Sequence, residues 1–150
     1  MSAARAASTL LAALLFAVLL AACGPEGTVA DQVRARIAAM ESAGEAGERA
    51  AFMAFVADGF QAQDRSMSRD DFRRFMFFQF SQQRRIQAQL FPITVEERGP
   101  NLAAARFKAL VTGGGGLIPD DGQLFDIETE WVLDGGDWML WRADWQPVGP

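Results

Sequence analysis

The chain has 150 residues, of which 50% are hydrophobic, so it is long enough and apolar enough for one domain with a hydrophobic core. Its 19 Asp and Glu residues outnumber its 14 Lys and Arg residues, and the formal net charge is −5 at pH 7. An acidic domain repels phosphate backbones, so we expect no nucleic-acid partner. The sequence has no His, no Tyr and one Cys, which excludes imidazole or phenol catalysis and an internal disulfide.

The N-terminal residues 1–22 have the pattern of a secretory signal peptide. Arg5 precedes an apolar run from Thr9 to Leu20, and small residues follow. The run is shorter than the roughly 20 residues that span a bilayer. Its end, Leu20-Ala21-Ala22-Cys23, resembles the lipobox of bacterial lipoproteins. In that family the chain is cut before the cysteine, which receives a diacylglycerol on its thiol and an acyl chain on its new amino group. The resemblance implies that Cys23 is lipidated.

Two other interpretations of this segment stay open: an uncleaved membrane anchor, and an ordinary signal peptide followed by a cysteine without a role. Under the lipoprotein interpretation, residues 23–27 are the lipidated cysteine and a short tether, and lipid on Cys23 holds the protein on a membrane. In lipoproteins an Asp after the cysteine favours retention in the inner membrane. Gly24 stands there instead, so the resemblance implies a place in the bacterial cell envelope, on the outer membrane facing the periplasm.

Helical signals dominate the first half of the remaining chain. The predicted helices are Thr28 to Ser42, Glu48 to Asp58 and Ser68 to Gln83. The pairs Thr28 with Asp31 and Ser68 with Asp71 resemble capping boxes, and Gly59 is expected to end the second helix. Residues 60–64 are expected to be extended or irregular. The third helix carries many phenylalanines, which we interpret as core side chains rather than a ligand cage.

The second half of the chain alternates apolar and polar residues, which is typical of strands. The predicted strands are Ile86 to Val95, Leu102 to Thr112, Gln123 to Leu133 and Trp138 to Trp145. Pro92 suggests a bulge or an edge position, and Asp134-Gly135-Gly136-Asp137 is a strong hairpin turn. Gly113 to Gly116 lacks the Lys and Ser or Thr of a phosphate loop. Asp120, Asp121 and Asp126 lack the pattern of a calcium loop. We therefore expect no cofactor and no metal.

Helices followed by an antiparallel meander predict an α+β fold, with the N-terminal helices packed on one face of a curved antiparallel sheet. The tail FDIETEWVLDGGDWMLWRADWQ, after a helical half with AFVADGF and SRDDFRRF, resembles the nuclear-transport-factor-2-like superfamily. The resemblance implies one cone-shaped, cystatin-like α+β roll at residues 28–147. The superfamily contains both enzymes and non-enzymes. Some of its isomerases use an Asp base with Tyr and Asp donors, and some of its dehydratases and cyclases use a His–Asp pair. Without Tyr or His, neither set can be assigned here.

The register of the last hairpin predicts which residues share a face. If Gly135 and Gly136 are the turn residues, Trp131 faces Leu140, Thr129 faces Arg142 and Ile127 faces Asp144. The resemblance implies that this face looks at the helices and lines a pocket. The pocket candidates are Thr129, Trp131, Arg142 and Asp144. The alternative for Arg142 and Asp144 is a structural ion pair at the rim of an ordinary core.

The opposite face of the same hairpin carries Met139, Trp141 and Trp145. This is more apolar surface than an exposed sheet face needs, so these three residues are candidates for an interface with a second copy or with an envelope protein. The alternatives are that the C-terminal tail covers the tryptophans or that a bulge turns them inward.

Two functional hypotheses follow. The first is a lipid-anchored envelope domain without catalysis, which binds a small apolar ligand or another protein. The second is an enzyme of the same fold, an isomerase or a hydrolase, that uses Asp144 with Arg142 in the pocket. The absence of His and Tyr favours the first hypothesis.

Overall fold

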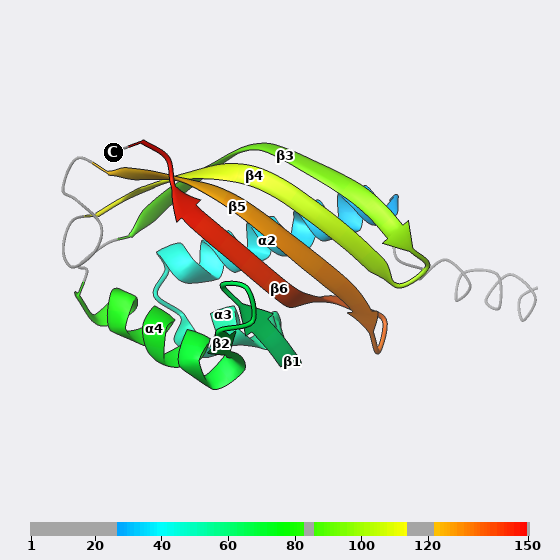
Figure 1. The fold of residues 1–150 in the computed structure, drawn as a ribbon, viewed down its shortest axis with the longest axis horizontal. Coiled ribbons are helices and arrows are strands. Elements are labelled where there is room, and N and C mark those ends of the chain that lie inside the picture. Colours follow the sequence, from blue (N-terminus) through cyan, green and yellow to red (C-terminus); the bar gives the residue numbers. More distant parts are fainter. Residues whose placement is uncertain (1–26, 83–85, 114–121, 150) are drawn as a thin grey trace, which may run out of the picture.

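The computed structural model describes residues 27–82, 86–113 and 122–149 (Figure 1). The predicted signal peptide at residues 1–22, the lipidation candidate Cys23 and residues 24–26 of the tether lie outside the described residues. So do most of the glycine loop, at residues 114–116, and Asp120 and Asp121. In the described part of the chain, no helix combines the length and the apolar composition needed to cross a membrane.

The fold has three described helices and six described strands. The helices are α2 Val29–Glu45, α3 Arg49–Ala54 and α4 Arg69–Gln82. The strands are β1 Val56–Ala62, β2 Met67–Ser68, β3 Gln87–Gly99, β4 Leu102–Thr112, β5 Gln123–Asp134 and β6 Asp137–Pro147. The six strands form one sheet in the order β2-β1-β6-β5-β4-β3. The predicted α+β class, with helices on one face of a curved sheet, is confirmed.

Local capping chemistry places the first described helix where the sequence predicts it. The hydroxyl of Thr28 accepts a 3.2 Å hydrogen bond from the N–H of Asp31, and the Asp31 carboxylate accepts one of 3.2 Å from the N–H of Thr28. The Thr28 hydroxyl also donates to the Asp31 carboxylate at 2.9 Å. The bonds that this carboxylate accepts from the Thr28 hydroxyl and N–H lower the pKa of the Asp31 carboxyl, because they favour its charged form. The capping box therefore fixes the start of α2.

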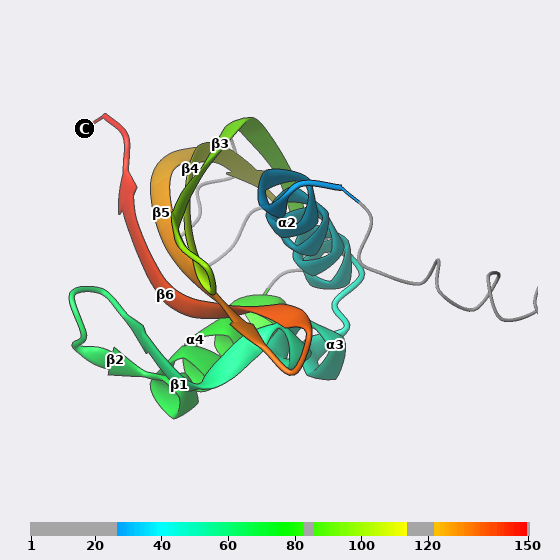
Figure 2. The same ribbon diagram turned by 90° about the vertical axis from the view of Figure 1, so that its right-hand side faces the viewer.

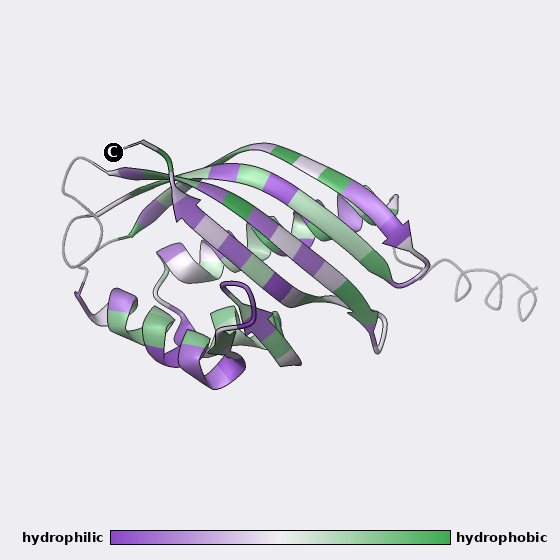
Figure 3. Ribbon diagram, viewed as in Figure 1, coloured by the Kyte–Doolittle hydropathy of each residue, from purple (hydrophilic) through white to green (hydrophobic). Residues whose placement is uncertain are grey.

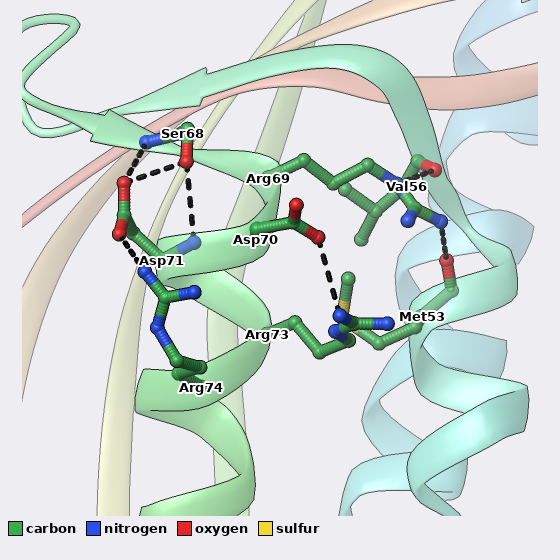
Figure 4. A network of polar contacts seen from close by, with 8 residues as sticks. All are labelled: Met53, Val56, Ser68, Arg69, Asp70, Asp71, Arg73 and Arg74. Carbon is green, nitrogen blue, oxygen red and sulfur yellow. Dashed lines mark hydrogen bonds and ion pairs between the residues drawn. The ribbon is translucent and has the colours of Figure 1, made fainter.

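Helix α4 begins with the same reciprocal arrangement (Figure 4). The Asp71 N–H donates to the Ser68 hydroxyl at 3.2 Å, and the Ser68 N–H donates to the Asp71 carboxylate at 3.0 Å. The neighbouring Arg69 guanidinium donates to the carbonyls of Met53 and Val56, each at 3.3 Å. Arg69 thus attaches the start of α4 to the end of α3 and the start of β1.

The sheet is mixed rather than purely antiparallel, which corrects the prediction. Strand β1 pairs with β6 in parallel, and the other neighbouring strands are antiparallel. The predicted second helix ran to Asp58, but α3 ends near Phe55, whose carbonyl accepts a 2.8 Å hydrogen bond from the Leu140 N–H. The chain is drawn into the sheet by this distant partner, so Gly59 lies within β1 and does not end a helix. Local sequence signals do not contain that pairing.

The sheet curves around the helices (Figure 2). Strands β3 to β6 form an arc around α2, and α4 lies against β1 below it. Along the strands, hydrophilic and hydrophobic residues alternate (Figure 3), which places one side of the arc toward the helices. The buried core side chains include Val33, Phe52, Val56, Phe60, Phe72, Trp131, Trp138 and Leu140.

Two polar contacts hold α2 against the β5–β6 hairpin. The Trp138 indole N–H donates to the side-chain oxygen of Gln32 at 3.0 Å, and the Arg36 Nε donates to the Trp138 carbonyl at 2.9 Å. The Arg36 guanidinium also lies 4.6 Å from the centre of the Phe55 ring. The hairpin turn itself has Gly135 and Gly136 at φ +59° and +89°, as the predicted tight turn requires.

Candidate functional site

A cavity of about 570 Å³ lies between the inner face of the sheet and the helices. Side chains of all three described helices and of β3 to β6 line it. The aromatic ones are Phe52, Phe72, Phe75, Phe80, Phe107, Phe125, Trp131 and Trp145. The volume falls in the range of about 300–1,000 Å³ that is typical of small-molecule pockets, and a mostly apolar wall is typical of them too.

Aromatic contacts hold the helical wall of the cavity to the sheet. The Phe75 and Trp145 rings stack with centroids 5.7 Å apart and planes 25° apart. The ring centroids of Phe72 and Trp145 are 5.9 Å apart. The Phe52 and Phe80 rings meet edge to face, with centroids 5.5 Å apart. Phe72 is therefore both a core side chain and part of the cavity wall, which Phe75 and Phe80 also line. Phe78 is 52% exposed, so the interpretation of the α4 phenylalanines as core side chains is wrong for this residue.

A β-bulge in β6 decides which hairpin residues reach the cavity. Trp131 pairs with Leu140, as predicted, but the register then shifts and Glu130 pairs with Arg142. Trp141 is left without a partner in β5, and every later residue of β6 points to the face opposite to the predicted one. The register between β1 and β6 shifts over the same stretch.

The predicted pairings of Arg142 and Asp144 are therefore wrong, and neither residue lines the cavity. Asp144 is exposed, and its carboxylate accepts a 2.7 Å hydrogen bond from the N–H of Asp64. The Arg142 Nε lies 3.8 Å from the Glu130 carboxylate. Arg142 thus forms an ion pair with Glu130, although its Nε makes no hydrogen bond within the described residues, and Asp144 binds Asp64. The rim ion pair between Arg142 and Asp144, the alternative prediction, is wrong as well.

Thr129 and Trp131 do line the cavity, and they hydrogen-bond to each other. Trp131 is 1% exposed, and its indole N–H donates to the Thr129 hydroxyl at 2.9 Å. That hydroxyl donates in turn to the carbonyl of Ala105 at 3.2 Å. Because these donors are already paired inside the protein, Thr129 and Trp131 shape the cavity and offer it little polar chemistry.

Only one of the three interface candidates changes face. Trp145 turns into the cavity wall because of the bulge. Met139 pairs with Val132 on the face opposite to Trp131 and is half-buried. Trp141 is also half-buried, and its ring packs so closely on Gly59 that a Cβ there would lie 2.8 Å from it. The sheet face that was predicted to carry two tryptophans carries one.

Five polar side chains other than Thr129 line the cavity, and three of them are engaged. They are Glu41, Glu45, Gln63, Gln79 and Gln123. Gln63 exchanges hydrogen bonds with the Trp145 backbone at 3.1 and 3.3 Å. Gln123 donates to the Leu124 carbonyl, and the Glu45 carboxylate accepts from the Ala88 N–H, both at 2.9 Å. The two remaining polar side chains of this group are Gln79 and Glu41.

Gln79 is 5% exposed, and its Oε1 has no hydrogen-bond partner within the described parts of the chain. Burying a hydrogen-bond acceptor without a partner costs about 1–3 kcal/mol, so such groups are rare in folded proteins. Sequence reasoning did not single out Gln79, although it is the only polar residue in the run from Phe75 to Phe80.

Glu41 is half-buried on α2, one turn before Glu45. Burial raises the pKa of the Glu41 carboxyl, and the negative charge of Glu45 raises it further. Among the described residues that line the cavity there is no Lys and no Arg to offset this charge. The Gln79 Oε1, which accepts hydrogen bonds, and the Glu41 carboxylate are therefore polar groups of the described wall that a ligand could meet. Over residues 27–82, 86–113 and 122–149, no cluster of Cys, Asp and Glu is arranged to hold a metal ion.

No protein-family model matches the chain, and no curated protein does so either. Solved structures do match it. A candidate dehydratase of the NTF2-like family from Streptomyces avermitilis has a TM-score of 0.67 at 19% identity, over 80% of this chain and 96% of the other. The chain has an NTF2-like fold.

Two further structures agree with this fold. An NTF2-like protein of unknown function from Pseudomonas putida has a TM-score of 0.66 at 17% identity, over 77% of this chain and 84% of the other. An uncharacterised protein with a cystatin-like fold from Caulobacter vibrioides has a TM-score of 0.68 at 15% identity, over 80% and 89%. At these identities the NTF2-like likeness concerns the fold, and the site must be argued from its own residues.

Proposed function

We propose that this protein is a lipid-anchored protein of the bacterial cell envelope whose NTF2-like domain binds a small, largely apolar ligand without transforming it. The observation that carries the proposal is the cavity of about 570 Å³ with its aromatic wall. Transfer of apolar surface out of water would supply most of the binding free energy, at about 25 cal/mol per Å².

The paired polar groups of the cavity support binding rather than catalysis. Thr129, Trp131 and Gln63 make hydrogen bonds to other parts of the protein. Arg142 and Asp144, the pair named for the enzymatic hypothesis, lie outside the cavity. A ligand in the cavity would therefore meet mainly hydrophobic surface.

The proposed envelope location rests on the sequence Leu20-Ala21-Ala22-Cys23. Metabolic labelling with a palmitate analogue tests it. The native protein should be labelled and should fractionate with outer membranes, and Cys23→Ser should be unlabelled. Equal labelling of Cys23→Ser would exclude lipidation at this residue.

Native mass spectrometry of the protein isolated from its own cells tests ligand binding. We expect a population that carries one small apolar molecule, released by organic solvent and identified by its mass. A protein that is free of small molecules, and that takes up none from a total lipid extract, would contradict the proposal.

An enzyme of the same fold is the second candidate, and one observation favours it. The raised pKa of Glu41 brings a carboxyl group closer to the range of a general acid or base. Incubation of the extracted molecule with fresh protein separates the candidates. Recovery of an unchanged molecule supports binding, and conversion that is lost in Glu41→Gln supports the enzyme.

A further inference from the structure

The unpaired Oε1 of Gln79 and the Glu41 carboxylate point to the head group of the ligand. This step rests on the proposed ligand-binding function and adds the chemical class of the ligand. Gln79 comes from α4 and Glu41 from α2, and both side chains contribute to the wall of the same cavity. Each stands near the C-terminal end of its helix.

These two helix ends lie on the same side of the molecule. In Figure 1, the C-terminal ends of α2 and α4 both point toward the region where β3 and β5 begin and β4 ends. The hydrogen bond from the Ala88 N–H to the Glu45 carboxylate fixes the end of α2 to the start of β3. The cavity therefore has a polar end, whereas Thr129 and Trp131 in the middle of the sheet are paired internally.

The electrostatics of this polar end favour a positive charge. The last turn of α2 contains Glu45 and no basic residue, and the C-terminus of a helix already carries partial negative charge. Glu41 adds a second carboxylate one turn earlier. The described residues of the cavity wall include no Lys or Arg, so this described part of the wall offers a carboxylate or phosphate ligand no counter-ion.

The hydrogen-bond chemistry favours a donor. The Gln79 Oε1 is an acceptor that no described residue satisfies. A buried acceptor of this kind gains most from an N–H or O–H group of the ligand, because the ligand then removes the penalty of an unmade bond. A carboxylate beside the same space makes a charged N–H donor better than a neutral one.

We propose that the cavity selects apolar molecules that end in a primary amine, whose ammonium group hydrogen-bonds to Gln79 and pairs with Glu41. The apolar part lies among Phe72, Phe75 and Trp145. A neutral alcohol of the same length binds more weakly, and a carboxylic acid binds weakest.

Displacement of an apolar fluorescent probe by octylamine, octanol and octanoate at pH 7 tests this order. Octylamine should displace N-phenyl-1-naphthylamine at a concentration about tenfold lower than octanol, since one charge-assisted hydrogen bond is worth about 1.5 kcal/mol or more. Octanoate should need the highest concentration. The assay uses the full-length protein in detergent, to which the fluorescent probe is bound before the octyl compound is added.

Matched variants separate the two contacts. Glu41→Gln should weaken octylamine about tenfold and leave octanol unchanged, with the exposed Glu48→Gln as control. Gln79→Leu should weaken both molecules, with the exposed Gln82→Leu as control. If Gln79→Leu fails to fold by circular dichroism, the more flexible Gln79→Met replaces it.

Two failures of this experiment have different meanings. If the probe binds and octanoate displaces it as well as octylamine does, or if Glu41→Gln leaves the preference intact, the amine assignment is wrong and ligand binding stands. If neither the probe nor any octyl compound binds to the folded protein, the proposed function fails and the amine assignment fails with it.

Discussion

The carboxylate of Asp144 accepts a 2.7 Å hydrogen bond from the backbone N–H of Asp64. Asp64 is the middle of three consecutive residues, Gln63, Asp64 and Arg65, with φ of +50°, +51° and +66°. This left-handed conformation costs roughly 1 kcal/mol or more for each residue that has a side chain. Asp144 therefore stabilises the strained turn between β1 and β2. It does not line the cavity, where it was a pocket candidate and where the alternative, enzymatic hypothesis required it.

Asp144→Ala should lower the free energy of unfolding by about 1 kcal/mol, because the Asp64 N–H loses its acceptor. It should also speed trypsin cleavage after Arg65. Asp144→Asn keeps an oxygen at this position and should resemble the wild type. Urea denaturation and limited proteolysis measure both effects, and identical behaviour of Asp144→Ala and the wild type would remove the assigned role.

Trp131→Ala should lower the free energy of unfolding by about 3–5 kcal/mol, as removal of a large buried aromatic side chain does. Its indole is 1% exposed and hydrogen-bonded to Thr129. Trp141→Ala is the matched control and should have a smaller effect, since Trp141 is half-buried against Gly59. Thermal denaturation followed by circular dichroism compares the two variants. A larger loss of stability in Trp141→Ala than in Trp131→Ala would contradict the position of the bulge in β6.

Asp71→Asn should destabilise the protein at neutral pH and not in acid. Hydrogen bonds from Ser68 lower the pKa of the Asp71 carboxyl in the folded state. A lowered pKa contributes stability above the unfolded value of about 4, and this contribution is lost as the pH falls through the folded value. The difference between Asp71→Asn and the wild type should therefore shrink below pH 4. A difference that stays constant from pH 7 to pH 3 would exclude the carboxylate as its cause.

Glu41→Gln should have the opposite pH dependence. Because burial and Glu45 raise the pKa of Glu41 in the folded state, its ionisation weakens the fold as the pH rises through that value. The variant avoids this loss, so it should be more stable than the wild type at pH 7, by less than about 1 kcal/mol because the carboxyl is only partly buried. The two should converge near pH 4. Denaturation midpoints of both proteins, measured from pH 4 to pH 7, test this prediction. A variant that is less stable than the wild type at pH 7 would contradict the environment assigned to Glu41.

Much of the fold could be predicted because its signals are local. The caps at Thr28 and Ser68 and the turn at Gly135 and Gly136 each depend on residues within four positions. The bounds of β4, Leu102–Thr112, follow from alternation alone. The bulge expected near Pro92 is present as a register shift between Phe91 and Thr94.

The rest depends on partners that are distant in the sequence. Strand β1 forms because it pairs with β6. The bulge at Trp141 lies where the register between these two strands shifts and where the Trp141 ring packs on Gly59. One bulge moved Arg142 and Asp144 out of the candidate site and Trp145 into it. Gln79 and Glu41 were missed because a polar residue on a helix is ordinarily solvated. Only the folded structure buries Gln79 and partly buries Glu41.

The central claim is that the cavity binds an apolar ligand. It is tested most directly by comparing the binding of an apolar fluorescent probe to the wild type and to a variant whose cavity is filled. Ala88 is on the cavity wall, and Ala104 is half-buried on the opposite face, paired with Glu130. The wild type and Ala104→Phe should bind one molecule of N-phenyl-1-naphthylamine per chain, and Ala88→Phe should bind it at least tenfold more weakly while it stays folded. A folded wild type without saturable binding, or an Ala88→Phe variant that binds as the wild type does, would contradict a ligand site in this cavity.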